Sequence, residues 1–516
     1  MEQAEGSVSD KAGIETADAN TPPPTRQDDR KVVSLFCLMA AIHTFVFCAG
    51  FPFFNNVDEP MHFDLVLKYS HGHVPRGLEM MSGDSAIYLA IFSSCAYFGT
   101  PEKFPGHEMP PPLWTEPAEK MQQDLAANRA GWEKVANFEV SQAPLYYALA
   151  GSWWHIGQWL GFQNGRLLYW LRFLNVLIVA GLVGISYVAA RIVFPENRFL
   201  RLGVPALAAF VPQTAFYSLG NDTLSAFCFG VTFVCLLKWL KGPSVPLAVG
   251  AGIAFAATYL SKTTNLPLLA VVFGAMLVKS CCGLKLENWR TVLPAFIAFL
   301  FCAAVPFAAW MIWCKSNYGD FTGSAIKIRY LGWTVKPFAQ WLEHPIFTAH
   351  GFWIFFSENF NTFWQGEFKW LDQPLCLPGT NVVYTIISAV LLAAGLTGLF
   401  PRLADATSSQ RLVLGLSLAS FGASFGFFAL MSIIYDFHDC PYPSQAHPYF
   451  TSGRLLLGGL IPFLLVSVYG LDLLLKRFSS KIKLFTLAGM ISGMFLLEVV
   501  TDWRVFSNPF NWFHLP

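Results

Sequence analysis

Asn55-Asn56-Val57-Asp58-Glu59-Pro60-Met61-His62 is the polar stretch that follows the first long apolar run, residues 32–54. The run contains no Asp, Glu, Lys or Arg, and as a helix it would measure about 35 Å, enough to cross a bilayer. Asp58 and Glu59 are therefore expected where a first transmembrane helix meets water. Two interpretations stay open: a proton acceptor at the level of the lipid headgroups, or a surface helix that one carboxylate caps and Pro60 begins.

The composition is that of a membrane protein. Of 516 residues, 54% are hydrophobic and 13% are charged, whereas soluble proteins carry about 25% charged residues. The net charge is +1, and the chain has no basic tract and no nucleotide loop of the G-x-x-x-x-G-K-S/T kind. The sequence therefore predicts no nucleic-acid partner and no ATP-driven activity.

The apolar runs predict an all-α polytopic fold with eleven spans. Residues 1–31 are polar and are interpreted as a disordered cytoplasmic tail, with Arg26, Arg30 and Lys31 placing the N-terminus inside. A transmembrane domain over 32–503 and an extracytoplasmic tail over 504–516 follow, in the plasma (inner) membrane. After the first run, spans are expected at 167–194, 203–219, 223–237, 245–260, 266–278, 292–313, 382–400, 412–435, 455–475 and 484–500.

Two long extracytoplasmic loops are expected, at 55–165 and 315–378. In the first, 86–98 is too short to span and is predicted to lie along the interface, and 115–140 is predicted to be a helix. A Trp-rich piece begins at Pro144, and whether it spans stays open; the positive-inside rule favours a surface position. Cys95, Cys376 and Cys440 fall outside the expected spans, and a disulfide among them is not readable from spacing.

The unusual polar residues share one side of the expected bundle, and two of them are cations that suit phosphate binding. Arg454 opens a late span, where a guanidinium can clamp a phosphate or snorkel as a helix anchor. Lys262 has the same two interpretations. The polar set on this side comprises Asp58, Glu59, Asn221, Asp222, Lys262, Asp320, Asp436, His438, Asp439 and Arg454.

Neither His71-Gly72-His73 nor the polar segment 436–439 shows a recognised metal spacing. The sequence therefore predicts no metal site and no certain cofactor, and it leaves a divalent metal open. Asn221-Asp222 is explained fully by a turn, with a hydrogen-bonding role towards substrate second.

Six short islands carry a resemblance to a known family over roughly residues 32–475. In chain order they are Asp58-Glu59-Pro60-Met61-His62-Phe63, Gln142-Ala143-Pro144-Leu145-Tyr146-Tyr147, Gly220-Asn221-Asp222, Leu260-Ser261-Lys262-Thr263, the segment from Trp310 to Gly323, and Ser452-Gly453-Arg454. Together they resemble motifs of a bacterial polytopic membrane protein family of unknown function in the GT-C glycosyltransferase clan. Ala143, Lys315 and Leu455 depart from the motifs.

The resemblance implies a GT-C-like fold and transfer of a sugar from a polyprenyl-phosphate donor, at the outer face, to a glycan, lipid or protein acceptor. It implies Asp58 as the general base with Glu59 in support. His62, Tyr146, Asn221, Asp222, Lys262 and Arg454 are the expected substrate-binding residues. The interfacial helices would hold the prenyl chain, and membrane lipids are further partners.

Two other functions stay open. A transporter or flippase of a lipid-linked or anionic solute predicts ionisable residues near the bilayer centre or inverted repeats, and the sequence shows neither; His43 in the first span is the nearest and is expected to be packed. The other remaining function is that of a non-catalytic subunit of an envelope assembly.

Overall fold

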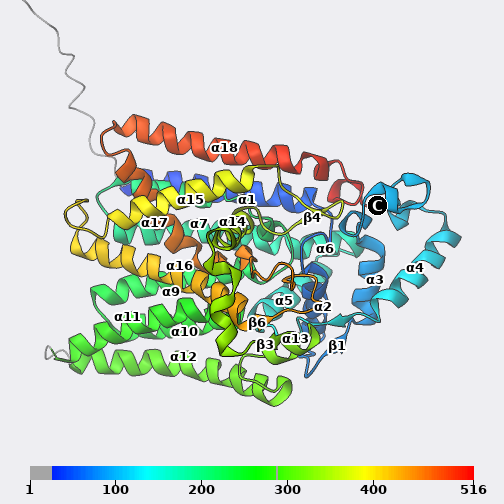
Figure 1. Cartoon of the computed structure of the whole chain (residues 1–516), viewed down its shortest axis with the longest axis horizontal. Coiled ribbons are helices and arrows are strands. Elements are labelled where there is room, and N and C mark those ends of the chain that lie inside the picture. The colour runs from blue at the N-terminus through cyan, green and yellow to red at the C-terminus, as the bar shows by residue number, and fades with distance from the viewer. Residues whose placement is uncertain (1–25, 286–288) are drawn as a thin grey trace, which may run out of the picture.

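The computed structural model describes residues 26–285 and 289–516 and shows a bundle of long helices lying side by side (Figure 1). Within those residues, nine helical segments are long and apolar enough to cross a membrane: Asp29–Gly50, Asn164–Val193, Asp222–Lys241, Thr263–Cys282, Trp289–Tyr318, Thr380–Thr397, Ser408–Ile434, Gly453–Leu474 and Ser480–Phe506. The predicted all-α polytopic architecture is confirmed.

The elements of the spanning segments have the following bounds: α1 (Arg26–Gly50), α6 (Asn164–Arg172), α7 (Leu174–Val193), α9 (Asp222–Lys241), η6 (Thr263–Asn265), α11 (Leu266–Lys285), α12 (Trp289–Tyr318), α15 (Thr380–Thr397), α16 (Ser408–Ile434), η9 (Gly453–Gly459), α17 (Leu460–Leu474) and α18 (Ser480–Phe506). Because α1 begins at Arg26, residues 26–31 are helical, which corrects part of the predicted disordered tail. Residues 1–25 of that tail lie outside the described residues.

Two of the eleven predicted spans fall short of a full crossing. Residues 203–219 are divided between α8 (Arg198–Ala208) and η5 (Thr214–Tyr217), with Pro212 in the break, where it supplies no backbone N–H. Residues 245–260 form α10 (Val245–Ser261), a helix of 17 residues that packs against α9 and α12.

The polar end of the bundle carries the shorter helices, and we call it the site end. Their bounds are α2 (Glu59–Ser70), α3 (Gly83–Phe92), α4 (Ala118–Trp132), α5 (Leu145–Trp159), α13 (Ser324–Tyr330) and α14 (Ala349–Gln365). The Trp-rich piece is α5, which at 15 residues is too short to span and packs against α2. The helix predicted over 115–140 is shorter, because the chain leaves α4 at Trp132 and pairs with a strand.

Three antiparallel two-stranded pairs tie these loops together in the described chain: β1 (Glu79–Met80) with β2 (Ala136–Asn137), β3 (Thr334–Val335) with β6 (Tyr435–Asp436), and β4 (Lys369–Trp370) with β5 (Gln373–Pro374). Single 3-10 turns complete them: η1 (Cys95–Tyr97), η2 (Pro101–Lys103), η3 (Pro105–His107), η4 (Leu113–Thr115), η7 (Phe338–Glu343), η8 (Pro345–Phe347) and η10 (Trp512–His514). All the cysteines are free, so the disulfide left open among Cys95, Cys376 and Cys440 is not formed.

Two apolar cores hold the fold. The larger fills the bundle, with Phe233, Trp239 and Leu464 fully buried. The second lies at the site end beneath α2, where Phe63 and Tyr147 are fully buried. This second core fixes α2, whose first turn carries the polar stretch that follows α1.

Candidate functional site

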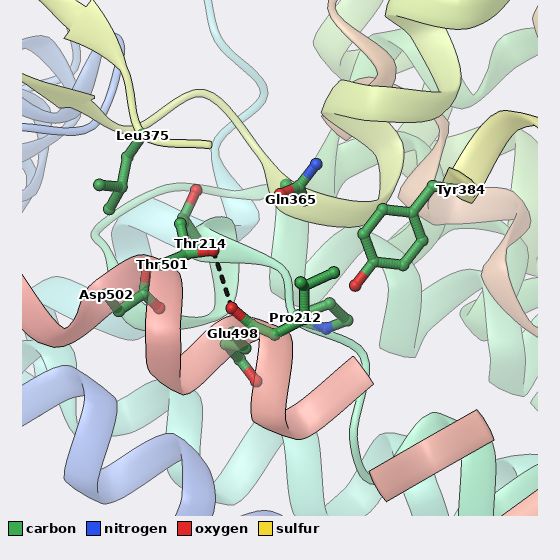
Figure 2. Close-up of a pocket in the computed structure, with 9 residues that line it drawn as sticks. Pro212, Thr214, Gln365, Leu375, Tyr384, Glu498, Thr501 and Asp502 are labelled. Atoms are coloured by element: carbon green, nitrogen blue, oxygen red, sulfur yellow. Dashed lines mark hydrogen bonds between the residues drawn. The ribbon is translucent and has the colours of Figure 1, made fainter. Parts of the chain in front are cut away.

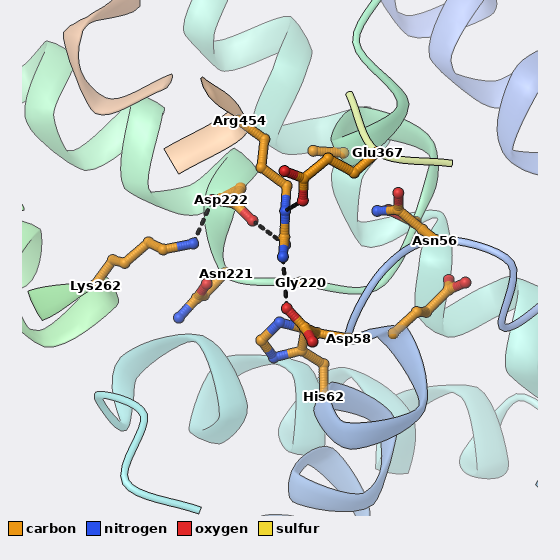
Figure 3. Close-up of polar contacts among 12 residues, drawn as sticks. Asn56, Asp58, His62, Gly220, Asn221, Asp222, Lys262, Glu367 and Arg454 are labelled. Carbon is orange, nitrogen blue, oxygen red and sulfur yellow. Dashed lines mark hydrogen bonds and ion pairs between the residues drawn. The ribbon is translucent and has the colours of Figure 1, made fainter. Parts of the chain in front are cut away.

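Asp58 occupies an unusual backbone position at the start of α2. It is the N-cap residue, with φ 66° and ψ −2°, but its side chain makes no capping hydrogen bond. The left-handed region costs a non-glycine residue on the order of 1–3 kcal/mol, and such positions cluster at functional sites. The surface-cap interpretation of Asp58 is therefore wrong for the side chain, which points instead into a buried polar cluster (Figure 3).

Arg454 lies at the centre of that cluster and binds three carboxylates. Its Nη2 donates to Asp58 Oδ2 at 2.5 Å, and its Nη1 donates to Asp222 Oδ2 at 3.2 Å. Its Nε donates to Glu367. Each nitrogen of the guanidinium thus has a carboxylate partner, and the side chain is only 6% exposed.

Lys262 completes the cluster by donating to the second carboxylate oxygen of Asp222. The five residues come from five places: the start of α2, the start of α9, the turn before η6, the segment after α14, and the second residue of η9. Three carboxylates face two cations, which leaves one excess negative charge. Buried charges need such pairing, because removing one partner costs about 3–5 kcal/mol.

The Asp58 carboxyl is ionised near neutral pH. Burial raises its pKa, but the charges of Arg454, Lys327 and His62 act in the opposite direction and together lower its pKa to about 2. Asp58 is also the most exposed of the three carboxylates, with 17% of its side chain accessible against 3% for Asp222 and 9% for Glu367. It is the member of the cluster that a ligand reaches first.

His62 lies on α2, one turn after Asp58 (Figure 3). Its Nδ1 is 2.6 Å from the hydroxyl of Tyr147. Burial lowers the pKa of His62 to about 4, against the opposing charges of Glu139 and Asp58. The ring is therefore neutral at physiological pH and keeps one nitrogen as a hydrogen-bond acceptor.

Glu59 faces a different cluster. Its carboxylate accepts from the backbone N–H groups of Phe54 at 2.8 Å and Leu219 at 2.9 Å, and it pairs with Arg172 at 2.7 Å. Arg172 also donates to the carbonyl of Phe51 at 2.7 Å. Glu59 thus anchors the turn after α1 to the segment before α9, and it makes no contact with Arg454.

Tyr146 and Asn221 border the cluster. The hydroxyl of Tyr146 accepts from the N–H of Gly220 at 3.2 Å, which holds the backbone just before Asp222. Asn221 donates to Gln142 at 3.0 Å, while its own Oδ1 is buried and has no hydrogen-bond partner among the residues that the structure describes. That oxygen is an acceptor left for a ligand or water.

Sequence reasoning missed Glu367 and a second group of hydrogen-bonded polar side chains around Glu139. Glu139 pairs with Lys327 and accepts from Gln142, which links α13 to Asn221. Glu367 lies in the extracytoplasmic loop expected over 315–378, outside all six sequence islands. The sequence feature that marks this position is the preceding glycine. Gly366 has φ 79°, and a Cβ added there would lie 2.0 Å from Thr214 Oγ1.

An acidic residue within the spans was overlooked: Glu498 lies inside the apolar run over 484–500. His43 in α1 lies 3.0 Å from Glu498 in α18, and Asp502 is one turn further along α18. His43 is packed among aromatic rings, as predicted. Among the described residues, no three or more His, Cys, Asp or Glu side chains are grouped to hold a metal ion.

The chain is similar to solved structures of an oligosaccharyltransferase from Archaeoglobus fulgidus. One, in complex with Zn and sulfate, is 12% identical with a TM-score of 0.39, over 91% of this chain and 53% of that chain. Another, AglB with an inhibitory peptide and a dolichol-phosphate, is 12% identical with a TM-score of 0.38, over 91% and 55%. The chain thus spans about half the length of these structures.

No curated protein matches the chain. The family model described as "Predicted membrane protein (DUF2142)" matches residues 42–430, a range that contains α2, the Asn221-Asp222 junction, Lys262 and Glu367. The match covers well over half of the sequence and agrees with the resemblance carried by the motifs. The chain therefore belongs to the DUF2142 family of predicted membrane proteins.

Proposed function

We propose that this protein is an integral membrane glycosyltransferase that moves a sugar from a polyprenyl-phosphate donor to a glycan, lipid or protein acceptor at the extracytoplasmic face. The observation that carries the proposal is the contact between Asp58 and Arg454. The contact puts a carboxylate and a guanidinium side by side at the end of a membrane bundle. The proposal gives them the roles of base and phosphate ligand for a lipid-linked donor.

Inverting transfer needs both groups. The acceptor oxygen attacks the anomeric carbon while its proton passes to Asp58, and the bond from that carbon to the phosphate oxygen breaks. The electron pair leaves with the polyprenyl phosphate, whose charge Arg454 and Lys262 neutralise. An oxocarbenium-like transition state is stabilised by the nearby carboxylates.

Three of the five N–H donors of Arg454 bind carboxylates, so a phosphate competes with one of these carboxylates for the guanidinium charge. Asp58 is the partner to leave, since it is the most exposed of the three carboxylates. Once the phosphate neutralises Arg454, the main charge that lowers the pKa of Asp58 is offset. The pKa of Asp58 then rises, so donor binding itself makes Asp58 a stronger base.

Glu59 has a structural role in this proposal, because its carboxylate is saturated by Arg172 and two backbone N–H groups. His62, neutral and adjacent, supplies an acceptor nitrogen for a sugar hydroxyl, and Asn221 Oδ1 supplies a second. Tyr146 positions the backbone of Gly220. Glu367 and Asp222 hold Arg454 in place while Asp58 moves.

The test is turnover by the purified full chain in nanodiscs with a panel of radiolabelled polyprenyl-phosphate sugars and a cell-envelope acceptor fraction. Transfer of label, lost in Asp58→Asn, supports the proposal. The matched control is Asp405→Asn, an exposed carboxylate paired with Lys476 outside the cluster. Full transfer by Asp58→Asn, or donor binding without turnover under every acceptor condition, contradicts it.

The alternative of a transporter or flippase gains one observation, the His43–Glu498 pair within the spans. A carrier predicts movement of a lipid-linked or anionic solute across proteoliposomes in the absence of any acceptor. Protection of the labelled headgroup from an impermeant reagent distinguishes this movement from transfer.

A further inference from the structure

A second polar cavity lies inside the bundle, away from Asp58 (Figure 2). It has a volume of about 10 Å³, which is room for one water molecule or one small ion. Glu498 and Asp502 of α18 line it, facing Thr214, Gln365 and Tyr384. The remaining lining residues are Pro212, Leu375, Leu497 and Thr501.

The two carboxyls of this cavity have unequal surroundings. Glu498 accepts from the hydroxyl of Tyr217 at 2.5 Å and lies 3.0 Å from His43 Nε2. Asp502 is 4% exposed, and no described residue donates a hydrogen bond to it or forms an ion pair with it. Buried carboxylates without a cationic partner are costly within a membrane and mark functional sites.

An independent observation points to a ligand. Thr214 is 5% exposed and lines the same cavity, and its Oγ1 has no hydrogen-bond partner among the described residues. A buried hydroxyl oxygen left unpaired destabilises the folded state. Two carboxylates and a hydroxyl oxygen on one small cavity are the donor set of a hard cation.

We propose that this cavity binds one small monovalent cation of the alkali type through Asp502, Glu498 and Thr214. A single positive charge takes the place of the proton that a buried carboxyl without a cationic partner keeps. The described chain groups no three His, Cys, Asp or Glu side chains for a metal ion, which argues against a divalent or transition metal here.

Two of the segments that line the cavity continue into the Arg454 cluster. Thr214 and Tyr217 belong to η5, which leads through Gly220 to Asp222. Gln365 ends α14, two residues before Glu367. A bound cation therefore stabilises the two segments that carry Asp222 and Glu367, the carboxylates that bind Arg454.

Thermal unfolding of the purified full chain tests the proposal without any activity assay. Choline chloride is exchanged for LiCl, NaCl or KCl at constant ionic strength. At least one alkali ion is expected to raise the Tm by about 2 °C or more, as ligands of the folded state do. Asp502→Asn and Thr214→Val are expected to lose this rise, while Asp405→Asn keeps it.

A second measurement needs no variant. Dicyclohexylcarbodiimide reacts with carboxyls in apolar surroundings: the acid oxygen adds to the central carbon of the reagent and the proton passes to nitrogen. Labelling of wild-type Asp502, located by peptide mass spectrometry, is expected to slow several-fold in the stabilising salt. Three results would overturn the proposal. They are a Tm that does not change with the cation, a rise in Tm that persists in Asp502→Asn, and labelling that no alkali ion slows.

Discussion

Arg454 Nη2 lies 2.5 Å from Asp58 Oδ2, although the two residues are 396 positions apart in the sequence. The contact joins the first turn after α1 to the first turn of η9. It brings together the two chemical requirements of transfer from a lipid phosphate, a base and an anion-binding cation. Each of the following experiments separates one part of this arrangement from the rest of the fold.

Asp58→Asn is expected to reduce transfer by about 10²- to 10⁴-fold, the usual cost of losing a general base. Arg454 keeps Asp222 and Glu367, so the variant is expected to insert and fold. Glu59→Gln is the neighbouring comparison, because it weakens the buried pair with Arg172. Both variants remove one partner of a buried ion pair and are expected to lower the Tm, but Glu59→Gln is expected to keep transfer in its folded fraction. Equal loss of transfer in both variants contradicts this division.

Arg454→Lys keeps the charge but supplies one nitrogen where the guanidinium uses three. We expect a lower Tm and at least a tenfold higher KM for the donor, since one charge-assisted hydrogen bond contributes about 1.5–3 kcal/mol. Lys476→Arg, an exposed basic position paired with Asp405, is the control. An unchanged donor KM would remove Arg454 from phosphate binding.

Stability is expected to fall with pH in two stages. The pKa of His62 is lowered to about 4 by burial, from an ordinary 6.5, so the unfolded chain takes up a proton first. Its contribution, up to about 3 kcal/mol, is present above pH 6.5 and is lost as the pH falls to about 4. His62→Gln should flatten the Tm profile over that window.

The second stage belongs to Asp58. Its folded pKa is lowered to about 2, so its contribution is present above an ordinary carboxyl pKa near 3.8 and is lost as the pH falls towards 2. Asp58→Asn should remove this stage and shift the His62 stage to lower pH, because the Asp58 charge raises the pKa of His62. A profile in which Asp58→Asn alters only the range above pH 6 would contradict the assignment.

Gly453→Ala is expected to displace Arg454. A Cβ at Gly453 would lie 1.9 Å from the carbonyl oxygen of Asn359, so η9 must move away from α14. Both the Tm and transfer should fall. Gly422→Ala in α16 is the matched control, because a Cβ there meets nothing within 4 Å and alanine favours a helix; equal losses in both variants would exclude the steric explanation.

The sequence predicted the spanning helices well where uncharged runs were long, as in α1 and α12. It failed at 203–219, because hydropathy does not register that Pro212 interrupts the helix between α8 and η5. It also failed at 498, where an acidic residue inside an apolar run was not noticed. The partners of that residue, His43 and Tyr217, come from distant segments.

The candidate site was partly predictable. Asp58, Asp222, Lys262 and Arg454 were all selected from short motifs, and the structure brings them into one cluster. Glu59 was grouped with Asp58 by adjacency alone. The left-handed backbone at Asp58, which no pattern predicts, turns the two neighbouring carboxylates in different directions. Glu367 carried no motif, so only the fold reveals it.

The Arg454 cluster draws one side chain from each of five places spread between residues 58 and 454. During synthesis the last of them reaches the membrane only after most of the chain has been inserted. Until then Asp58, Asp222 and Glu367 lack their central cation, and Lys262 offsets the charge of Asp222 alone. If the protein is the proposed transferase, a chain that ends before Arg454 is therefore expected to lack transfer activity.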